Sequence, residues 1–215
     1  WGRIVAQVVY YVTSALALGA PWRPISFTVP TGNFGDVFAG YVAKRIGVPI
    51  ERLVIATNAN DILARTLESG RYEKSGVVPT QSPSMDIEVS SNFERLLYEA
   101  AGRDDAVVRQ LMGGLAQSGA FTVPGAALEA IRSEFAAGRA GEDDTAATMR
   151  SMLAATGYLA DPHTAVALSV AARLDVSAAP MVTLATAHPA KFPAAVEAAT
   201  GVRPALPSWL GDLMQ

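Results

Sequence analysis

The first 70 residues alternate between segments typical of helices and segments typical of strands, a pattern that few folds accept. The predicted helices cover residues 1–18, 36–46 and 60–69, and the predicted strands cover residues 25–29 and 52–57. Strands that are separated by helices run parallel, because each helix carries the chain back across the sheet. The pattern therefore predicts an α/β fold, a three-layer sandwich in which helices cover both faces of a mostly parallel sheet.

The strand predicted at 25–29 runs into a turn with two glycines, Thr31-Gly32-Asn33-Phe34-Gly35, and a helix begins near Asp36. Such a turn directs backbone N–H groups and a helix N-terminus at one place, which suits a phosphate dianion. We expect Gly32 and Gly35 to adopt positive φ and to let the backbone approach a ligand closely. An ordinary strand–turn–helix connection is the alternative, because the signatures of P-loops and dinucleotide-binding turns are missing.

The rest of the chain is predicted to leave the sheet and then return to it. Residues 70–92 are expected to be loop-rich, and residues of about 92–141 are expected to form a mostly helical insertion that is broken at its glycines and at Pro124. Beyond these, we expect helices at 142–156, 163–173 and 189–199 and a strand at 180–185. Ligands of parallel sheets bind outside the carboxyl ends of the strands, which is where the glycine turn and the residues after the second strand fall.

The composition excludes several classes of function. Half of the residues are apolar and 17% are charged, which is typical of a well-buried globular protein, and the net charge of -3 argues against nucleic acid. Cysteine is absent, so no disulfide, thiolate metal site or cysteine nucleophile is possible. The only histidines, His163 and His188, have no metal-ligand spacing. We therefore expect a cytoplasmic protein without a metal.

The apolar stretch from Ile4 to Ala20 has the spacing of an amphipathic helix and is interrupted by Gln7, so we expect it to pack on a core rather than to span a membrane. The chain starts with Trp1, directly inside this helix. We interpret that start as entry partway through a longer protein.

Six segments spread over nearly the whole chain resemble motifs of threonine synthases, in the same order. They are VPTGNFGD at 29–36, ATNAND at 56–61, SMDI at 84–87, SSNFER at 90–95, DPH at 161–163 and TAHPAKF at 186–192. The resemblance is to the C-terminal portion of the family. It implies a pyridoxal-phosphate enzyme of fold type II, similar to the β subunit of tryptophan synthase, that converts O-phospho-L-homoserine and water to L-threonine and phosphate.

The resemblance also implies roles for individual residues. The cofactor phosphate is expected to bind the turn formed by Gly32, Asn33, Phe34, Gly35 and Asp36, which agrees with the phosphate site predicted from the turn itself. Thr186 matches the family position whose hydroxyl faces the pyridine nitrogen, where an aspartate would instead hold a proton on the ring. Contacts with the substrate are expected from Asn60, Asp61, Ser84, Asp86 and His188.

Structural interpretations remain open for these residues. Thr186 suits the cap of the helix expected at Pro189, and Asn60 or Asp61 suits the cap of the helix at 60–69. A lone histidine is usually a core or cap-adjacent residue, and a serine-rich loop is usually solvated. On the first interpretation His163 is a core or cap-adjacent residue and His188 only shapes its turn. On the second, Ser84 and Asp86 belong to a solvated loop.

The implied chemistry needs a lysine that binds the cofactor as a Schiff base and then transfers protons. In the family this lysine belongs to a Phe-Lys-Asp segment in the preceding part of the chain, and no such segment is present here. Among the lysines of this chain, Lys44, Lys74 and Lys191, only the last is expected near the cleft, and it matches a different family position. We therefore assign no catalytic residue and expect these residues to be inactive alone.

Two other functions stay open at this point. Another fold-type II enzyme, a threonine dehydratase or a phospholyase, has the same kind of phosphate loop. A non-catalytic domain that binds phosphorylated metabolites would account for the missing lysine.

Overall fold

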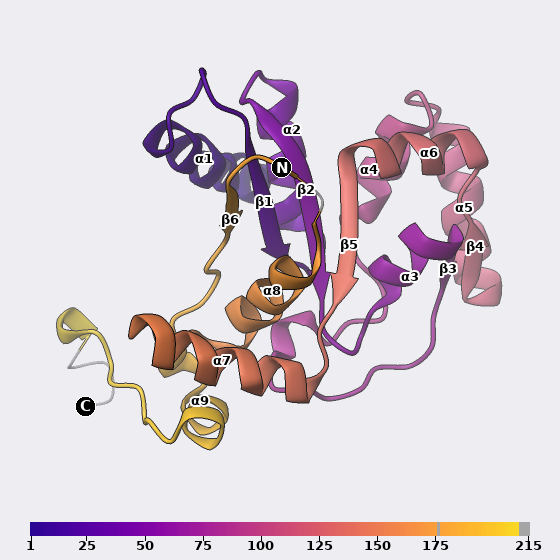
Figure 1. Cartoon of the computed structure of the whole chain (residues 1–215). Coiled ribbons are helices and arrows are strands. Elements are labelled where there is room, and N and C mark those ends of the chain that lie inside the picture. The colour runs from indigo at the N-terminus through magenta and orange to yellow at the C-terminus, as the bar shows by residue number, and fades with distance from the viewer. Residues whose placement is uncertain (176, 211–215) are drawn as a thin grey trace.

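The computed structural model describes residues 1–175 and 177–210 and is organised around a parallel sheet (Figure 1). In this described part of the chain the sheet has the order β5-β2-β1-β6. Its strands are β1 (Ile25–Pro30), β2 (Ile50–Thr57), β5 (Phe135–Arg139) and β6 (Met181–Thr183), and each pairs in parallel with its neighbours. All residues of β1 are buried, as expected for a central strand that is covered on both faces.

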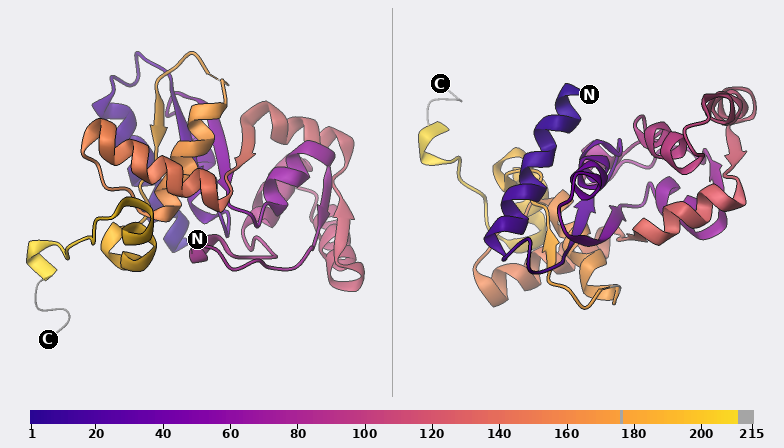
Figure 2. Two further views of the ribbon diagram at one scale, coloured as in Figure 1. Left: turned by 60° about the horizontal axis from the view of Figure 1, so that its bottom comes forward. Right: turned by 90° about the horizontal axis from the view of Figure 1, so that it is seen from above.

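Helices cover the two faces of the sheet, as Figures 1 and 2 show. They are α1 (Gly2–Ala17) and α2 (Gly35–Arg45) on one face and α8 (Pro162–Arg173) on the other, with α7 (Glu142–Thr156) and α9 (Pro193–Thr200) packed beyond α8. Alternate residues of β2 enter different cores: Leu53 and Ile55 join the large core with α1 and α2, whereas Val54 and Ala56 pack against α8. This strand periodicity confirms the predicted three-layer α/β sandwich.

A smaller group of elements lies beside β5 (Figure 1). It consists of α3 (Ile62–Ser69), β3 (Arg71–Glu73), α4 (Phe93–Ala100), α5 (Asp105–Ser118), β4 (Ala120–Thr122) and α6 (Gly125–Glu134). The strands β3 and β4 pair antiparallel. Tyr72 of β3 stacks between Phe121 and Phe93, with ring centroids 4.8 Å and 5.6 Å apart, and this stack joins the group to the large core.

The sequence did not predict the short strands β4 and β5 in the mostly helical segment 92–141, nor β3 in the loop-rich segment 70–92. The residues of β5, Phe-Ala-Ala-Gly-Arg, have little intrinsic preference for a strand. They form one because they pair with β2 from Leu53 to Thr57. Gly138 is required there, since a Cβ atom would lie 2.8 Å from Val170 of α8. Contacts between distant segments thus override local preference.

The helix predicted at 189–199 is divided in two. Residues Pro189–Lys191 form one 3-10 turn, and α9 begins only at Pro193. Pro193 has no N–H group to donate to the carbonyl of residue 189, so a continuous α-helix cannot pass through it. By contrast, the helix predicted at 142–156 is confirmed with the same bounds as α7. No helix among the described residues has both the length and the apolar character needed to cross a bilayer.

Candidate functional site

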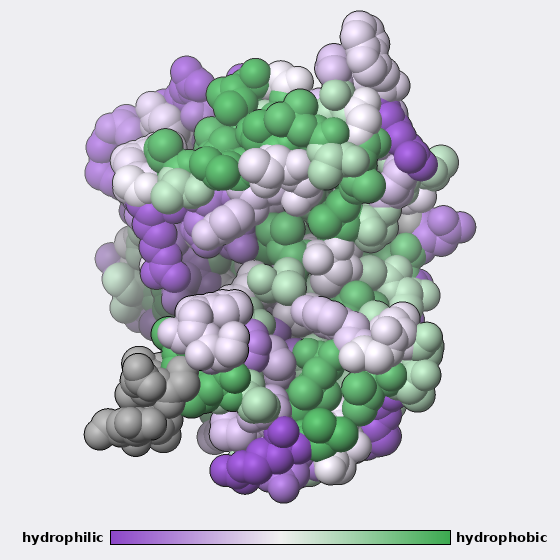
Figure 3. All heavy atoms as spheres, turned by 90° about the vertical axis from the view of Figure 1, so that its left-hand side faces the viewer, coloured by the Kyte–Doolittle hydropathy of each residue, from purple (hydrophilic) through white to green (hydrophobic). Residues whose placement is uncertain are grey.

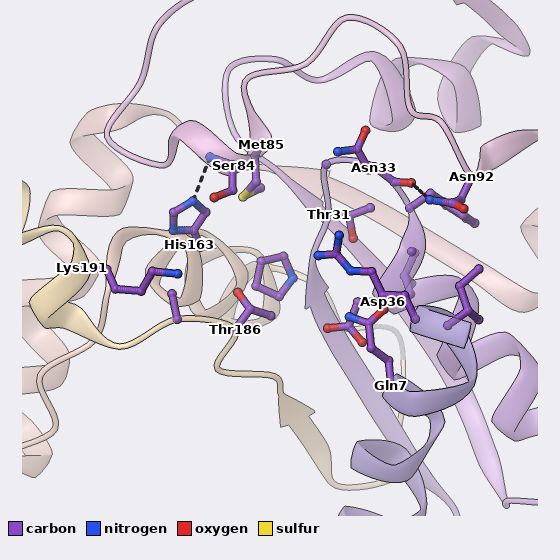
Figure 4. Close-up of a pocket in the computed structure, with 18 of the residues that line it drawn as sticks. Gln7, Thr31, Asn33, Asp36, Ser84, Met85, Asn92, His163, Thr186 and Lys191 are labelled. Atoms are coloured by element: carbon purple, nitrogen blue, oxygen red, sulfur yellow. Dashed lines mark hydrogen bonds between the residues drawn. The ribbon is translucent and has the colours of Figure 1, made fainter. Parts of the chain in front are cut away.

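A pocket lies at the carboxyl ends of β1 and β6, where the strand order reverses. The chain goes from β1 to β2 and β5 on one side, while β6 returns on the other side of β1. The connections that leave such a point diverge and leave a crevice between them. The pocket has a volume of about 360 Å³. Its lining comes from the 30–37 turn, the N-terminal end of α1, Ser84 and Met85, Asn92, His163, and Thr186, Ala187 and Lys191 (Figure 4).

The turn after β1 owes its shape to Phe34 rather than to its glycines. Phe34 has a φ of 64°, in the left-handed region, whereas neither Gly32 nor Gly35 has positive φ. The expectation of positive φ at the glycines is therefore wrong. The Phe34 ring is buried against Phe93 and Phe135, at centroid distances of 5.3 Å and 5.9 Å. This burial compensates the strain of about 1–2 kcal/mol that a left-handed residue with a side chain carries.

Glycine at position 32 is explained by a close approach between two segments. A Cβ atom on Gly32 would lie 2.7 Å from the Ser84 carbonyl oxygen and 3.1 Å from Met85 Cα. A Cβ atom on Gly35 would meet nothing nearer than Asn92 Nδ2, at 3.6 Å. Only Gly32 is thus required by its neighbours.

The backbone N–H groups of residues 32–37 have no acceptor within the described part of the chain. The Thr31 N–H still donates to Ala56, at 2.8 Å, and the N–H of Phe38 is the first to donate back to the turn, at 3.1 Å. The residues that carry these unpaired donors all line the pocket, and they include the N-terminus of α2. Such a concentration of donors at a helix N-terminus is an anion-binding arrangement.

Two cationic side chains, Arg3 and Lys191, and one carboxyl, Asp36, also line the pocket. Burial raises the pKa of Asp36 to about 6, although the Tyr11 hydroxyl and, to a smaller extent, the Arg3 charge act to lower it. The Tyr11 hydroxyl donates to the Asp36 carbonyl oxygen at 2.8 Å and lies 3.3 Å from Oδ1. Burial, together with the Asp36 charge, raises the pKa of Tyr11. Arg3 and Lys191 bring positive charge to the same pocket, which suits an anionic ligand.

Two further polar residues of the pocket were not predicted from the sequence. Gln7 Oε1 is buried without a donor in the described residues, so the pocket offers an unused acceptor. Asn92 secures the turn, since its Nδ2 and its backbone N–H donate to the Asn33 carbonyl oxygen at 2.8 Å and 3.1 Å. Gln7 comes from α1, where no local pattern marks it, whereas Asn92 belongs to the SSNFER segment at 90–95, which did not by itself indicate a contact with the turn.

His163 is a pocket residue as well as a core residue. Its side chain is 4% exposed, and its Nε2 accepts a hydrogen bond from the Ser84 N–H at 3.1 Å (Figure 4). Its Nδ1 lies 2.9 Å from Oδ1 of Asp161, which begins α8. The interpretation of His163 as a core residue is correct in that its side chain is buried, but it did not predict that His163 also lines the pocket.

The pocket brings together only part of the predicted site. Gly32, Asn33, Phe34, Gly35, Asp36, Ser84 and Thr186 all line it. Asn60 instead donates to the half-buried Asp86 at 2.9 Å, and Asp61 pairs with Arg65 and Arg139 at 2.7 Å and 3.0 Å. These three residues do not line the pocket, and their contact with a substrate stays a prediction.

His188 has a structural contact of its own outside the pocket lining. Its Nδ1 accepts from the Ala190 N–H at 3.1 Å and so caps the turn that begins at Pro189. The capping interpretation of Thr186 is therefore wrong, because His188 occupies the cap. Within the described residues, no group of three or more His, Asp or Glu side chains is arranged to hold a metal ion.

Comparisons with known proteins point to one family. A sequence model for "Threonine synthase, C-terminal" matches residues 164–215. The chain is 48% identical over 217 residues to threonine synthase of Pseudomonas aeruginosa, covering 100% of this chain and 46% of that protein. It thus spans less than half the length of this relative.

Comparison with solved structures points to the same family. The crystal structure of pyridoxal-phosphate-bound threonine synthase from Brucella melitensis matches with a TM-score of 0.98 and 67% identity, over 100% of this chain and 46% of that one. A fungal L-serine ammonia-lyase from Rhizomucor miehei matches with a TM-score of 0.56 and 11% identity, over 85% of this chain and 51% of that one. The second match shows a shared fold alone.

Proposed function

The chain belongs to the threonine synthase family, and on that premise we propose that it is the C-terminal part of the catalytic domain of a pyridoxal-phosphate enzyme. The proposed reaction converts O-phospho-L-homoserine and water to L-threonine and phosphate. One observation carries the proposal: the unpaired N–H groups of residues 32–37 meet at a pocket beside β1, at the reversal of strand order.

The residues of the pocket fit the phosphate of such a cofactor. A phosphate dianion needs several donors and little negative charge nearby, and the 32–37 turn supplies backbone donors at the N-terminus of α2. Arg3 and Lys191 add positive charge to the pocket, which offsets the negative charge that Asp36 carries at neutral pH. A volume of about 360 Å³ lies in the range typical of small-molecule sites.

Each part of the pocket has a proposed task. When bound, pyridoxal phosphate supplies an electron sink for charge that develops on a substrate carbon. The N–H groups of residues 32–37 bind its phosphate and thereby orient it. Thr186, whose side chain is exposed at the pocket, presents a neutral hydroxyl to the pyridine nitrogen. Ser84 lines the same pocket and is the predicted substrate residue best placed to contact a ligand there.

We propose that the lysine of the reaction lies outside these 215 residues. Lys44 is paired with Glu134 and does not line the pocket, whereas Lys191 does line it. Lys191 is therefore the competitor within this chain, and an experiment has to separate it from a lysine elsewhere in the full-length protein.

Borohydride reduction of the full-length protein with pyridoxal phosphate, followed by peptide mapping, makes this separation. We expect the adduct on a lysine outside residues 1–215, and the same yield in the Lys191→Arg variant. An adduct on Lys191 would contradict the assignment of the lysine, and no adduct in either protein would contradict the cofactor.

The reaction itself is tested by its products. The full-length protein is expected to release phosphate and threonine from O-phospho-L-homoserine in equal amounts, and the 215 residues alone are expected to release none. Formation of 2-oxobutyrate from threonine as the main activity would instead favour a dehydratase.

A further inference from the structure

The segment 80–86, which forms one wall of the pocket, is held at two points. At one end, the Asp86 carboxylate accepts hydrogen bonds from Asn58 and Asn60 at 2.8 Å and 2.9 Å, and from the hydroxyl and the N–H of Thr80 at 2.7 Å and 2.8 Å. In the middle, the Ser84 N–H donates to His163 Nε2 at 3.1 Å. The segment is therefore tied both to the end of β2 and to α8.

The position of this segment matters to the phosphate-binding turn. The Ser84 carbonyl oxygen lies 2.7 Å from the place that a Cβ atom of residue 32 would occupy, so the segment packs directly on the backbone of Gly32. On the other side, Ser90 Oγ donates to the Gly32 carbonyl oxygen at 2.7 Å. The backbone of Gly32 is thus held between the Ser84 backbone and the Ser90 hydroxyl.

His163 has one ring orientation and one tautomer that satisfy its contacts. Because Nε2 accepts from the Ser84 N–H, the ring proton belongs on Nδ1, where it is donated to Asp161 Oδ1 at 2.9 Å. Asp161 is fully buried and also accepts from the His163 N–H at 2.9 Å and from the Thr164 hydroxyl. Phe192 packs on the imidazole at a centroid distance of 4.7 Å.

We propose that His163 is a positioning residue for the phosphate-binding turn. Its Nε2 lone pair holds the Ser84 backbone against Gly32, and this contact keeps the N–H groups of residues 32–37 directed at the ligand phosphate. The identity of the ligand rests on the proposed function, whereas the contact between His163 and Ser84 does not.

Three substitutions separate positioning from a general structural role. Gln at position 163 retains an acceptor near the place of Nε2 and so keeps the Ser84 contact. Asn retains a partner for Asp161 and does not reach Ser84. Phe keeps a ring and removes both nitrogens. If His163 acts through Ser84, His163→Gln should behave like the native protein, and His163→Asn should behave like His163→Phe. If it acts only through Asp161, His163→Asn should behave like the native protein and His163→Gln like His163→Phe.

The measurement is the equilibrium dissociation constant of the full-length protein for pyridoxal phosphate, with pyridoxal as the probe that lacks the phosphate. We expect His163→Phe and His163→Asn to raise Kd for pyridoxal phosphate about tenfold, the usual effect of losing one positioning hydrogen bond, while Kd for pyridoxal changes little. We expect His163→Gln to stay near the native value. Equal Kd values in all variants, or equal changes for both probes, would overturn the proposal.

Two measurements remain decisive if the variants fold poorly or the native protein does not bind pyridoxal phosphate. In the native protein with ¹⁵N-labelled histidine, we expect the NMR spectrum to report His163 protonated on Nδ1. We also expect the amide of Ser84 to exchange slowly with solvent. A proton on Nε2, or rapid exchange at Ser84, contradicts the His163 contact, while absence of cofactor binding with both signals intact contradicts only the proposed function.

Discussion

At the scale of single residues, the two glycines of the turn have different reasons to be glycine. Gly32 has no room for a Cβ atom, since the Ser84 carbonyl oxygen would lie 2.7 Å away, whereas at Gly35 the nearest atom would lie 3.6 Å away. The Ser84 backbone cannot withdraw easily because His163 and Asp86 hold its segment.

This difference leads to a matched pair of variants. Gly32→Ala is expected to lower the free energy of unfolding by about 1–3 kcal/mol, the usual cost of overpacking. Gly35→Ala is expected to change it by less than about 0.5 kcal/mol or to raise it, because alanine favours the first turn of a helix more than glycine does. Urea unfolding of both variants measures this, and equal losses would refute the account of Gly32.

Asp36 gives a pH-dependent prediction. Its pKa is about 6 in the folded protein and has an ordinary value of 3.8. Between pH 3.8 and about pH 6, Asp36 is protonated in the folded protein and ionised in the unfolded chain. The stability that the protonated Asp36 contributes is therefore complete below pH 3.8 and is lost as the pH rises through about 6.

Asp36→Asn cannot ionise and is expected to avoid that loss. In the absence of cofactor, we expect the variant to be more stable than the native protein at pH 7 by about 1–2 kcal/mol, reduced from the full shift because the carboxyl is partly exposed. The advantage is expected to vanish near pH 4. Urea unfolding at both pH values measures it, with Asp143→Asn, at an exposed position in α7, as the control. An advantage independent of pH would be inconsistent with the raised pKa.

At the scale of elements, the start of α8 combines a helix cap with a buried polar network. Asp161 accepts from the His163 N–H at 2.9 Å, from its Nδ1 at 2.9 Å and from Thr164, all without exposure to water. Asp104 caps α5 in a similar way, accepting from Ala106 at 2.9 Å, but at the surface.

The two caps therefore predict different costs. Asp161→Ala is expected to destabilise the protein by about 3 kcal/mol, because it removes a cap and also leaves buried donors unpaired. Asp104→Ala is expected to cost about 1 kcal/mol, the value of an exposed cap. Thermal or urea unfolding compares them, and similar losses would show that burial of the Asp161 network adds nothing.

At the scale of the whole molecule, one side of the structure presents apolar groups to solvent. Val5, Val9 and Leu16 of α1 are 58%, 54% and 61% exposed, and β6 pairs only with β1 within the described residues. Figure 3 views the molecule from the left of Figure 1, the side on which α1 and β6 lie, and apolar side chains gather over the upper part of that face. Exposed apolar surface of this kind favours association.

We expect the 215 residues on their own to self-associate through this face. Val5 and Val9 lie one helical turn apart, so the double variant Val5→Glu, Val9→Glu places two charges on the same surface. Sedimentation velocity is expected to show less association for this variant. The control is Val77→Glu, Val78→Glu, which adds the same charge at exposed loop positions. Monomeric native protein at all concentrations, or an equal effect of the control pair, would argue against this face.

The features that depend on neighbours along the chain could be predicted without the structure. The β-branched run at 25–29, the turn after it and the helix that follows are all recognisable locally, and so is α7 with its acidic first turn. The proposal of a phosphate site at this turn rests on the same local pattern. Helix periodicity and turn chemistry act over a few residues, and they remain visible in a single sequence.

The features that join distant segments depend on the folded structure. The strand β5 exists because β2 offers it a partner, and Gly32 is required because Ser84 lies against it. Gln7 enters the pocket from α1 without any local signal, and the DPH motif marks His163 without indicating that it contacts Ser84. Even the left-handed Phe34 depends on the aromatic core that buries its ring. The physical reason is the same in each case: these conformations are stabilised by packing and hydrogen bonds between segments that only the folded chain brings together.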